Sequence, residues 1–122
     1  MPPDHRPSLG RLGERLAGEH YERLGYRVLE RNHRTAGGEL DLIAFDGATI
    51  VFVEVKTRRL GGLDPVESVG PAKQRRLRRL AAEWLSQTTG SPRARELRFD
   101  VVGVVVDAEG RLVALDQREA LI

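Results

Sequence analysis

The sequence predicts an α/β domain in which helices flank a mixed central β-sheet, with its elements in the order αβββαββ. Two segments repeat apolar residues at the spacing of an amphipathic helix, and five shorter segments bounded by turn residues read as strands. The chain has 122 residues, of which 40% are hydrophobic and 31% are charged, a balance typical of one ordinary globular domain. We therefore treat residues 1–122 as a single domain.

The first helix is expected from Leu9 to Leu24. Ser8 stands where an N-cap would, and Gly25 stands where a left-handed C-terminal cap would. Apolar side chains recur along this segment at helical spacing, the last of them at Leu24, and predict its buried stripe. A strand should follow over residues 26–34, and residues 1–7 ahead of the helix should form a flexible tail.

The next two strands form the clearest hairpin of the chain. They are expected over residues 39–45 and 49–56, and the Asp46-Gly47 pair between them is a typical turn sequence. Loops of two residues and of four residues both fit this turn, and they differ in the register of the two strands.

The second half of the chain completes the sheet. Residues 57–70 contain three glycines and one proline without any periodicity, so this stretch should be an exposed, mobile loop. Pro71 suits the first turn of a helix that runs to about Ser86. A valine-rich interior strand is expected over residues 97–106, and a short strand over residues 111–115. The connection into the valine-rich strand is long enough for a parallel crossover, which makes the sheet mixed.

Composition excludes several classes of protein. The chain has no cysteine, which rules out disulfide frameworks, thiolate zinc sites, iron–sulfur clusters and cysteine nucleophiles. No apolar run approaches the roughly 20 residues that span a bilayer, and the N-terminus lacks the apolar stretch of a signal peptide. We therefore expect a cytoplasmic protein without a membrane partner.

Positive charge is concentrated in one part of a nearly neutral chain. The net charge is +2, yet residues 56–79 carry eight basic and two acidic side chains. A basic segment of this kind favours a local anionic partner, although a solvated helix face explains the charge equally well.

Three charged residues interrupt the apolar pattern of the hairpin. Asp41 lies in its first strand, and Glu54 and Lys56 lie near the end of the second. A loop of either two or four residues puts the three side chains on the same side of the sheet. Convergent carboxylates repel each other and favour Mg²⁺ or Mn²⁺. The alternative is a structural ion-pair cluster at the end of the sheet.

The order of these motifs resembles a known group of nucleases. Asp41, twelve intervening residues and then Glu54-Val55-Lys56 resemble the signature of the PD-(D/E)xK superfamily, which has the restriction-endonuclease-like fold. More narrowly, three stretches resemble the YraN family of small bacterial proteins, predicted endonucleases similar to archaeal Holliday-junction resolvases. They are LGRLGE at residues 9–14, GELDLI at residues 38–43 and VFVEVKTR at residues 51–58.

The resemblance covers nearly the whole chain and implies a role for each of four residues. Asp41 and Glu54 would be metal ligands, and Lys56 would be the catalytic lysine. Glu14 would be the upstream acid seen in resolvase-like relatives. It lies at the edge of the buried stripe of its helix, and the other interpretation is an ordinary solvated glutamate.

Other polar residues are candidates to support this site or to contact phosphates. Glu39 shares the face of Asp41, and Lys73 and Gln74 lie on the inward face at the start of the second helix. Nearby arginines could contact phosphates without reading bases, and a solvated face explains each of them as well. They are Arg58, Arg59, Arg75, Arg76, Arg78 and Arg79.

The leading hypothesis is a nuclease that uses Mg²⁺ or Mn²⁺ to hydrolyse DNA phosphodiester bonds, with branched or structured DNA as one candidate substrate. The competing hypotheses are a non-catalytic nucleic-acid-binding protein and a DNA-processing adaptor on the same fold. The intact set of Asp41, Glu54 and Lys56 favours the enzyme, because a pure binder would not need carboxylates that face phosphate. A homodimer is compatible with the sequence but not required by it.

Overall fold

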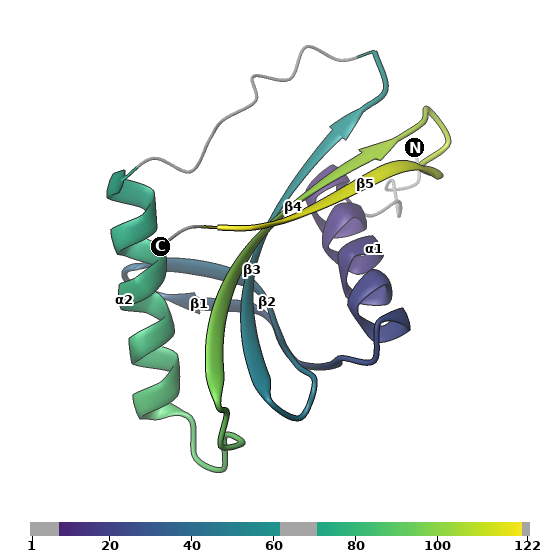
Figure 1. Ribbon diagram of the computed structural model, residues 1–122. Coiled ribbons are helices and arrows are strands. Elements are labelled where there is room, and N and C mark those ends of the chain that lie inside the picture. Colours follow the sequence, from purple (N-terminus) through teal and green to yellow (C-terminus); the bar gives the residue numbers. More distant parts are fainter. Residues whose placement is uncertain (1–7, 62–70, 121–122) are drawn as a thin grey trace, which may run out of the picture.

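The computed structural model describes residues 8–61 and 71–120. These residues form two helices on opposite faces of one five-stranded sheet (Figure 1). The elements are α1 (Leu9–Arg23), β1 (Arg27–Thr35), β2 (Gly38–Phe45), β3 (Thr49–Arg59), α2 (Pro71–Gln87), β4 (Glu96–Val106) and β5 (Leu112–Glu119). The predicted α/β class and the order αβββαββ are therefore confirmed.

The strands lie in the order β1-β2-β3-β4-β5, so each strand pairs with its neighbours in the sequence. The β3–β4 pair is parallel and the other three pairs are antiparallel. Helix α2 supplies the crossover between the two parallel strands, as the length of that connection predicts. This mixed, open sheet is consistent with the restriction-endonuclease-like fold.

The ends of α1 follow from its capping residues. The Ser8 hydroxyl accepts a hydrogen bond from the backbone N–H of Arg11 at 3.3 Å, and Gly25 has the left-handed backbone of a C-terminal cap, with φ 95°. The prediction that Leu24 closes the buried stripe is wrong, because its side chain is 55% exposed. Leu24 is the C-cap residue that follows the last helical residue, Arg23, so it lies beyond the buried stripe of the helix.

The hairpin has the register of a four-residue loop. Phe45 pairs with Ile50, and the pairing continues to Leu42 and Val53. The side chain of Asp46 stabilises the turn, because its carboxylate accepts backbone hydrogen bonds at 2.9 and 2.7 Å from the two residues before Ile50. Of the two registers that the turn sequence allows, the structure therefore has the longer loop.

The sheet separates two apolar cores. The core under α1 contains Ala17, Tyr21, Leu42, Ala44, Val51, Val53, Val102, Val104 and Val106. The core under α2 contains Leu40, Ile43, Ile50, Phe52, Leu77, Leu80, Ala81 and Trp84. Strands β2 and β3 contribute to both cores, which explains why their sequences are apolar on both faces.

Strand β3 is longer than the sequence predicts. The expected mobile loop was to begin at Thr57, but residues 57–59 continue the parallel ladder with β4. The side chains of this stretch are polar, so the sequence pattern does not indicate a strand. The stretch is a strand because its backbone N–H and C=O groups form hydrogen bonds with β4. Leu60 and Gly61 form a turn, and Leu60 N–H still donates to the carbonyl of Val106 at 2.8 Å. The remainder of the predicted loop, residues 62–70, and the predicted tail, residues 1–7, lie outside the described residues.

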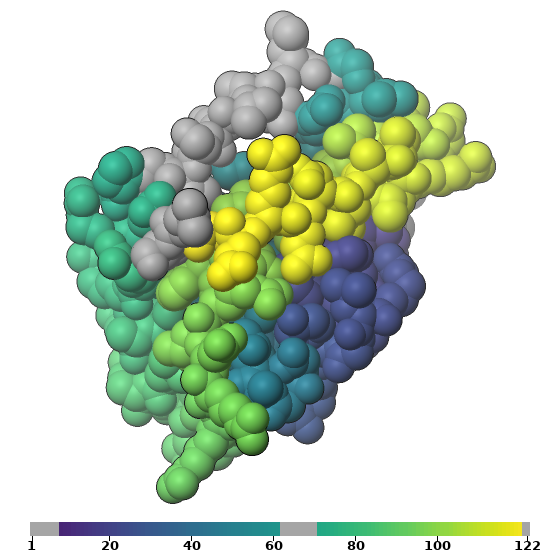
Figure 2. All heavy atoms as spheres, in the orientation of Figure 1, coloured from purple at the N-terminus to yellow at the C-terminus, as the bar shows by residue number. Residues whose placement is uncertain are grey.

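Strand β5 is also longer than expected, since it runs through Glu119 rather than ending near Leu115. It pairs only with β4 and lies across the surface of the molecule (Figure 2, yellow). An exposed edge strand keeps polar residues, so its hydrophobic pattern fades after Leu115. In the described ranges, neither α1 nor α2 is long and apolar enough to cross a membrane.

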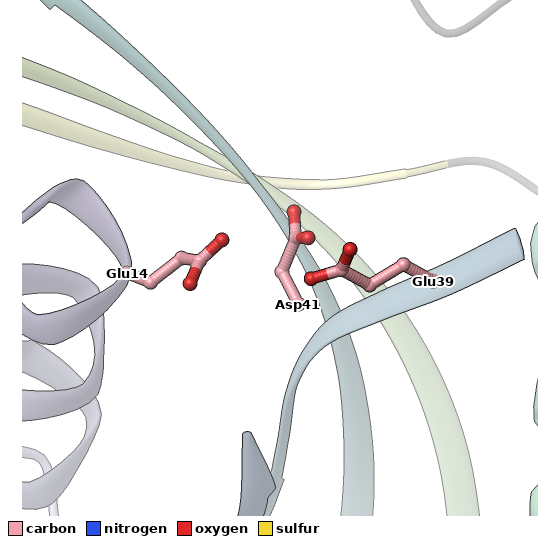
Figure 3. Close-up of side chains that lie close together, drawn as sticks. All are labelled: Glu14, Glu39 and Asp41. Atoms are coloured by element: carbon pink, nitrogen blue, oxygen red, sulfur yellow. The ribbon is translucent and has the colours of Figure 1, made fainter. Parts of the chain in front are cut away.

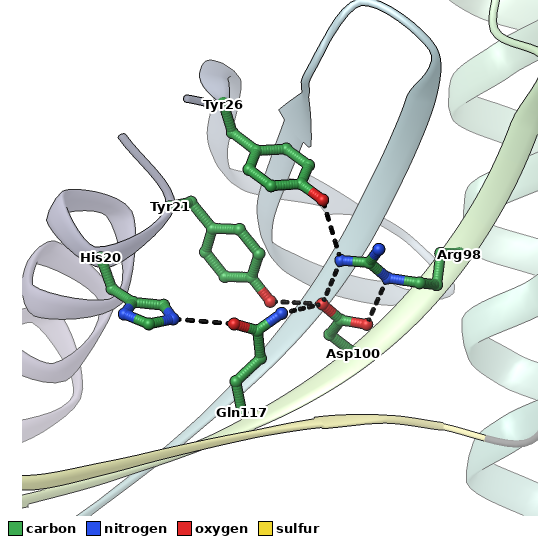
Figure 4. Close-up of polar contacts among 6 residues, drawn as sticks. All are labelled: His20, Tyr21, Tyr26, Arg98, Asp100 and Gln117. Carbon is green, nitrogen blue, oxygen red and sulfur yellow. Dashed lines mark hydrogen bonds and ion pairs between the residues drawn. The ribbon is translucent and has the colours of Figure 1, made fainter. Parts of the chain in front are cut away.

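A buried polar network ties α1 to β4 and β5 (Figure 4). At its centre the Asp100 carboxylate is inaccessible to solvent, and it accepts hydrogen bonds from the Tyr21 hydroxyl at 2.5 Å and the Gln117 amide at 3.0 Å. The guanidinium of Arg98 donates to both Asp100 oxygens, at 2.9 and 3.0 Å. The outer members of the network are His20, beside Gln117, and Tyr26, beside Arg98.

Two glycines of α1 give a matched test of how closely the helix packs on the sheet. A Cβ at Gly13 would lie 2.7 Å from the Cβ of Thr57 on β3, whereas a Cβ at Gly10 would meet nothing within 4 Å. We expect Gly13→Ala to lower the free energy of unfolding by about 1–3 kcal/mol through overpacking. Gly10→Ala should be neutral or stabilising. Denaturant unfolding of both variants measures this difference, and equal stabilities would contradict the close approach at Gly13.

Candidate metal centre

Three carboxylates from two elements converge at one side of the sheet. Glu14 comes from α1, and Glu39 and Asp41 come from β2. One oxygen of each lies within 4.8 Å of an oxygen of the other two. In Figure 3, Asp41 stands between the other two side chains, and all three point toward a common volume. We call these three residues the acid cluster.

A slip in β2 directs Asp41 toward α1. Leu40 and Ile43 pack in the same core under α2 although they are three residues apart, so the alternation of faces shifts by one residue between them. The regular pairing of β2 with β3 ends at the same place, at Leu42. The Asp41 carboxylate accepts a hydrogen bond from the backbone N–H of Val55 at 2.8 Å, which anchors it where the two strands part.

Burial and negative neighbours both act on Asp41. The pKa of Asp41 is raised from 3.8 to about 6 by desolvation and, to a lesser extent, by the carboxylates of Glu54, Glu14 and Glu39, while the hydrogen bond from Val55 opposes the shift. All the charged groups that dominate its surroundings are acidic. Asp41 is therefore poorly explained as one half of a structural ion pair.

Glu14 shows the same pattern. Its pKa is raised by burial and by the charge of Glu39, against the opposing effects of Asn32, Arg11 and Arg34. Its Oε2 atom is buried and has no hydrogen-bond partner among the described residues. A buried, unsatisfied carboxylate oxygen is unusual in a folded protein, and here it faces two further carboxylates. The solvated-glutamate interpretation of Glu14 does not fit this burial.

The structure does not place Glu54 in the acid cluster. Its Oε1 lies 2.5 Å from Nζ of Lys73 in the first turn of α2, with the two side chains 15% and 28% exposed. Asp41 lies beside Glu14 of α1, whereas Glu54 lies beside Lys73 of α2. That Asp41 and Glu54 share one side of the sheet stays a prediction. The two carboxylates remain within electrostatic reach, since Glu54 contributes to the raised pKa of Asp41.

The remaining predicted residues belong to β3 and α2. Lys56 is half-buried on β3, two residues after Glu54, and Gln74 is half-buried in the first turn of α2. The helix arginines Arg75, Arg76, Arg78 and Arg79 are all exposed. On β3, Arg59 is exposed and Arg58 is half-buried.

Comparison with known proteins identifies the family of this chain. Residues 13–104 match the model of the family described as "Uncharacterised protein family UPF0102". The chain belongs to the UPF0102 family. It is 52% identical over 101 residues to a UPF0102 protein of Beutenbergia cavernae, a match that covers 82% of this chain and 84% of the relative. A UPF0102 protein of Corynebacterium efficiens is 47% identical over 117 residues, which cover 95% of this chain and 93% of the relative.

A third relative shows a similar degree of identity. The UPF0102 protein of Acidothermus cellulolyticus is 47% identical over 109 residues, covering 82% of this chain and 83% of the relative. The family resemblance inferred from the three YraN-like stretches is thus confirmed at the level of UPF0102. The span that matches the family model includes the whole acid cluster and both lysines of the chain.

The structure of this UPF0102 protein also identifies pocket residues that were not selected from the sequence. An open pocket beside Glu14 is lined by Arg11, Arg15, Arg31 and Asn32. Asn32 has a left-handed backbone, with φ 52°, which is rare within a strand. Arg11 and Arg15 are one helical turn apart on α1, so the sequence alone predicts that their side chains are neighbours. It does not predict the pocket, because the other two lining residues, Arg31 and Asn32, come from β1.

Proposed function

We propose that this UPF0102 protein is a divalent-metal-dependent nuclease that hydrolyses DNA phosphodiester bonds. One observation carries the proposal: folding brings Glu14, Glu39 and Asp41 from two elements to within 4.8 Å of one another. Grouped carboxylates repel one another, and a hard divalent cation with oxygen ligands relieves that repulsion. The superfamily resemblance of the residues around Asp41 supports the same chemistry.

The donor set fits Mg²⁺ or Mn²⁺. Every donor is a carboxylate oxygen, and the buried Oε2 of Glu14 has no other partner among the residues described. Asp41, Glu14 and Glu39 would hold the ion, and the resemblance adds Glu54 to this set. A bound divalent ion supplies a polarised phosphoryl oxygen and a water molecule that ionises near neutral pH.

The chain's own residues account for the other requirements of the reaction. Lys56 follows Glu54 on the same face of β3, where its ammonium would neutralise negative charge that develops on the phosphoryl group. The exposed arginines of α2 offer contacts to the DNA backbone that do not depend on base sequence. A domain that has both an exposed basic helix face and an acidic cluster suits a phosphodiester substrate, whose negative charge must be held near the cation without being repelled.

Lys56→Ala tests the chemical step separately from metal binding. All the carboxylates remain, so we expect the affinity for Mn²⁺ to change little. Cleavage should slow by on the order of 10²-fold or more, as when other electrostatic contacts to a transition state are removed. Isothermal titration calorimetry and single-turnover cleavage with excess enzyme measure the two effects. Lys56→Arg, which keeps the charge, should retain more activity than the alanine variant.

The substrate class requires a screen of the unmodified protein. Linear, flapped and four-way DNA are incubated with Mg²⁺ or Mn²⁺, and matched reactions contain a chelator. The proposal expects cleavage of at least one DNA only in the presence of the metal. DNA binding without cleavage of any substrate, although Mn²⁺ binds, would instead support the non-catalytic nucleic-acid-binding protein.

A further inference from the structure

The ion pair between Lys73 and Glu54 is not explained by the helix that carries the lysine. The N-terminus of a helix has a partial positive charge, so its first turn favours acidic residues and disfavours lysine. Helix α2 nevertheless has no acidic residue in its first turn and places Lys73 there. The ammonium lies 2.5 Å from Oε1 of Glu54, and both side chains are largely withdrawn from solvent. The position of Lys73 is thus accounted for by Glu54.

Packing holds the lysine in this place. Leu77, Leu80 and Trp84 follow Lys73 along one face of α2, and all three are buried against the sheet. Because Lys73 lies one turn before Leu77, the same stripe that docks the helix also sets its backbone over the end of β3. Lys73 is one of only two lysines in a chain with 20 basic residues. A lysine ammonium is compact and more easily displaced from a carboxylate than a bidentate guanidinium.

The surroundings of Glu54 indicate what this ammonium does. Glu54 acts electrostatically on Asp41, which already adjoins the carboxylates of Glu14 and Glu39. Without a positive charge beside it, Glu54 would add another unpaired carboxylate to this region, where Glu39 already pairs with Arg34 at 3.2 Å. Lys73 provides that charge in the metal-free protein.

We propose that Lys73 is a positioning residue of the metal site: its ammonium holds Glu54 in the metal-free protein and is displaced from it when a divalent cation binds. This inference rests on the proposed function. After displacement the lysine stays at the start of α2, close to Glu54. It therefore competes with the cation before binding and offers a positive charge to the substrate afterwards.

Lys73→Met removes the competing charge and keeps the length of the side chain. We expect the Mn²⁺ dissociation constant to fall by about tenfold, the order of a partly exposed ion pair that no longer has to be broken. The melting temperature of the metal-free protein should fall, because Glu54 loses its partner, and saturating Mn²⁺ should restore most of the loss. Calorimetry and thermal unfolding with and without Mn²⁺ measure these effects.

Two controls separate this role from a merely structural one. Lys73→Arg keeps a positive charge beside Glu54 and should bind Mn²⁺ as weakly as the parent protein or more weakly. Arg93→Met removes an exposed positive charge from the connection that follows the far end of α2, and should change the affinity less than twofold.

The outcomes are distinguishable. A purely structural lysine predicts that Lys73→Met lowers the melting temperature equally with and without Mn²⁺ and does not tighten metal binding, and that result would overturn the inference while leaving the proposed function standing. If the parent protein binds no Mn²⁺, both the proposed metal site and the role of Lys73 are wrong.

Discussion

Asp41→Asn is expected to make the metal-free protein more stable and, at the same time, to reduce metal-dependent cleavage by at least about 10²-fold. The loss of cleavage follows from the loss of an anionic metal ligand at the centre of the acid cluster. The gain in stability follows from the raised pKa of Asp41, which reflects how unfavourable its ionised form is among other carboxylates. Asparagine has no ionised form, and its side-chain oxygen still accepts the hydrogen bond from Val55.

The pH dependence of this gain has a definite sign. The pKa of Asp41 is about 6 in the folded protein and near its ordinary value of 3.8 in the unfolded chain. Between these values the folded state binds more protons than the unfolded state, so the contribution of Asp41 to stability falls as pH rises from about 4 to about 6. The advantage of Asp41→Asn should be small at pH 4 and complete above pH 7. We expect on the order of 1–2 kcal/mol after solvent screening, which corresponds to several degrees in melting temperature.

Asp46→Asn provides a control of opposite sign in the same hairpin. The backbone N–H groups of Thr49 and Ala48 lower the pKa of Asp46, so its ionised form stabilises the folded state. Asp46→Asn should therefore lower the melting temperature at neutral pH, where Asp41→Asn raises it. A destabilised Asp41→Asn variant at pH 7 would instead support the structural ion-pair cluster. Added Mn²⁺ should stabilise the parent protein more than the Asp41→Asn variant, because the variant lacks one anionic ligand.

Local signals in the sequence predict most of the fold. The caps at Ser8 and Gly25 and the two apolar stripes define the helices, because capping and amphipathic spacing depend on neighbours within a few residues. The ends of β3 and β5 could not be predicted in this way. Their terminal residues are polar, and their strand conformation comes from backbone pairing with β4, a partner remote from β3 in the sequence.

The candidate site could be predicted only in part, again because some of its features depend on residues that are remote in the sequence. Asp41 and Glu54 stand out because they are charged residues in apolar strands, and that signal is local. The slip of β2 at Asp41 is a tertiary feature that arises because Leu40 and Ile43 both pack against α2. The structure brings Glu14 and Glu39 to within 4.8 Å of Asp41, while Glu54 pairs with Lys73. A strict alternation rule could not have found this arrangement.

Asp100 was not selected from the sequence, although a charged residue within the valine-rich β4 segment was a visible irregularity. Its carboxylate is completely buried, and Tyr21, Gln117 and Arg98 each donate hydrogen bonds to it. Burial and the hydrogen bond to Asp100 raise the pKa of Tyr21, so its hydroxyl keeps its proton and remains a donor. The three side chains that contact the carboxylate thus all donate hydrogen bonds to it, and Arg98 also carries a positive charge. A negatively charged group that only accepts hydrogen bonds is therefore required at this position.

Asp100→Asn should consequently destabilise the protein by about 3–5 kcal/mol, the usual effect of removing one partner from a buried charge pair. The new amide group would turn a donor toward other donors, and the Arg98 guanidinium would lose its counter-ion. Denaturant unfolding at neutral pH measures the loss. Tyr21→Phe removes a single hydrogen bond and should cost only about 1–2 kcal/mol.

The exposed pair of Asp116 and Arg118 on β5 supplies the control for Asp100. Their N–O distance of 2.7 Å is as short as the contacts around Asp100, but the two side chains are 63% and 79% exposed. Because water screens such a pair, Asp116→Asn should change the free energy of unfolding by less than about 1 kcal/mol. If Asp100→Asn were equally mild, the network in Figure 4 would not be what fastens α1, and with it Glu14, to the sheet. A large loss for Asp100 alone would instead show that burial, rather than contact distance, sets the strength of these pairs.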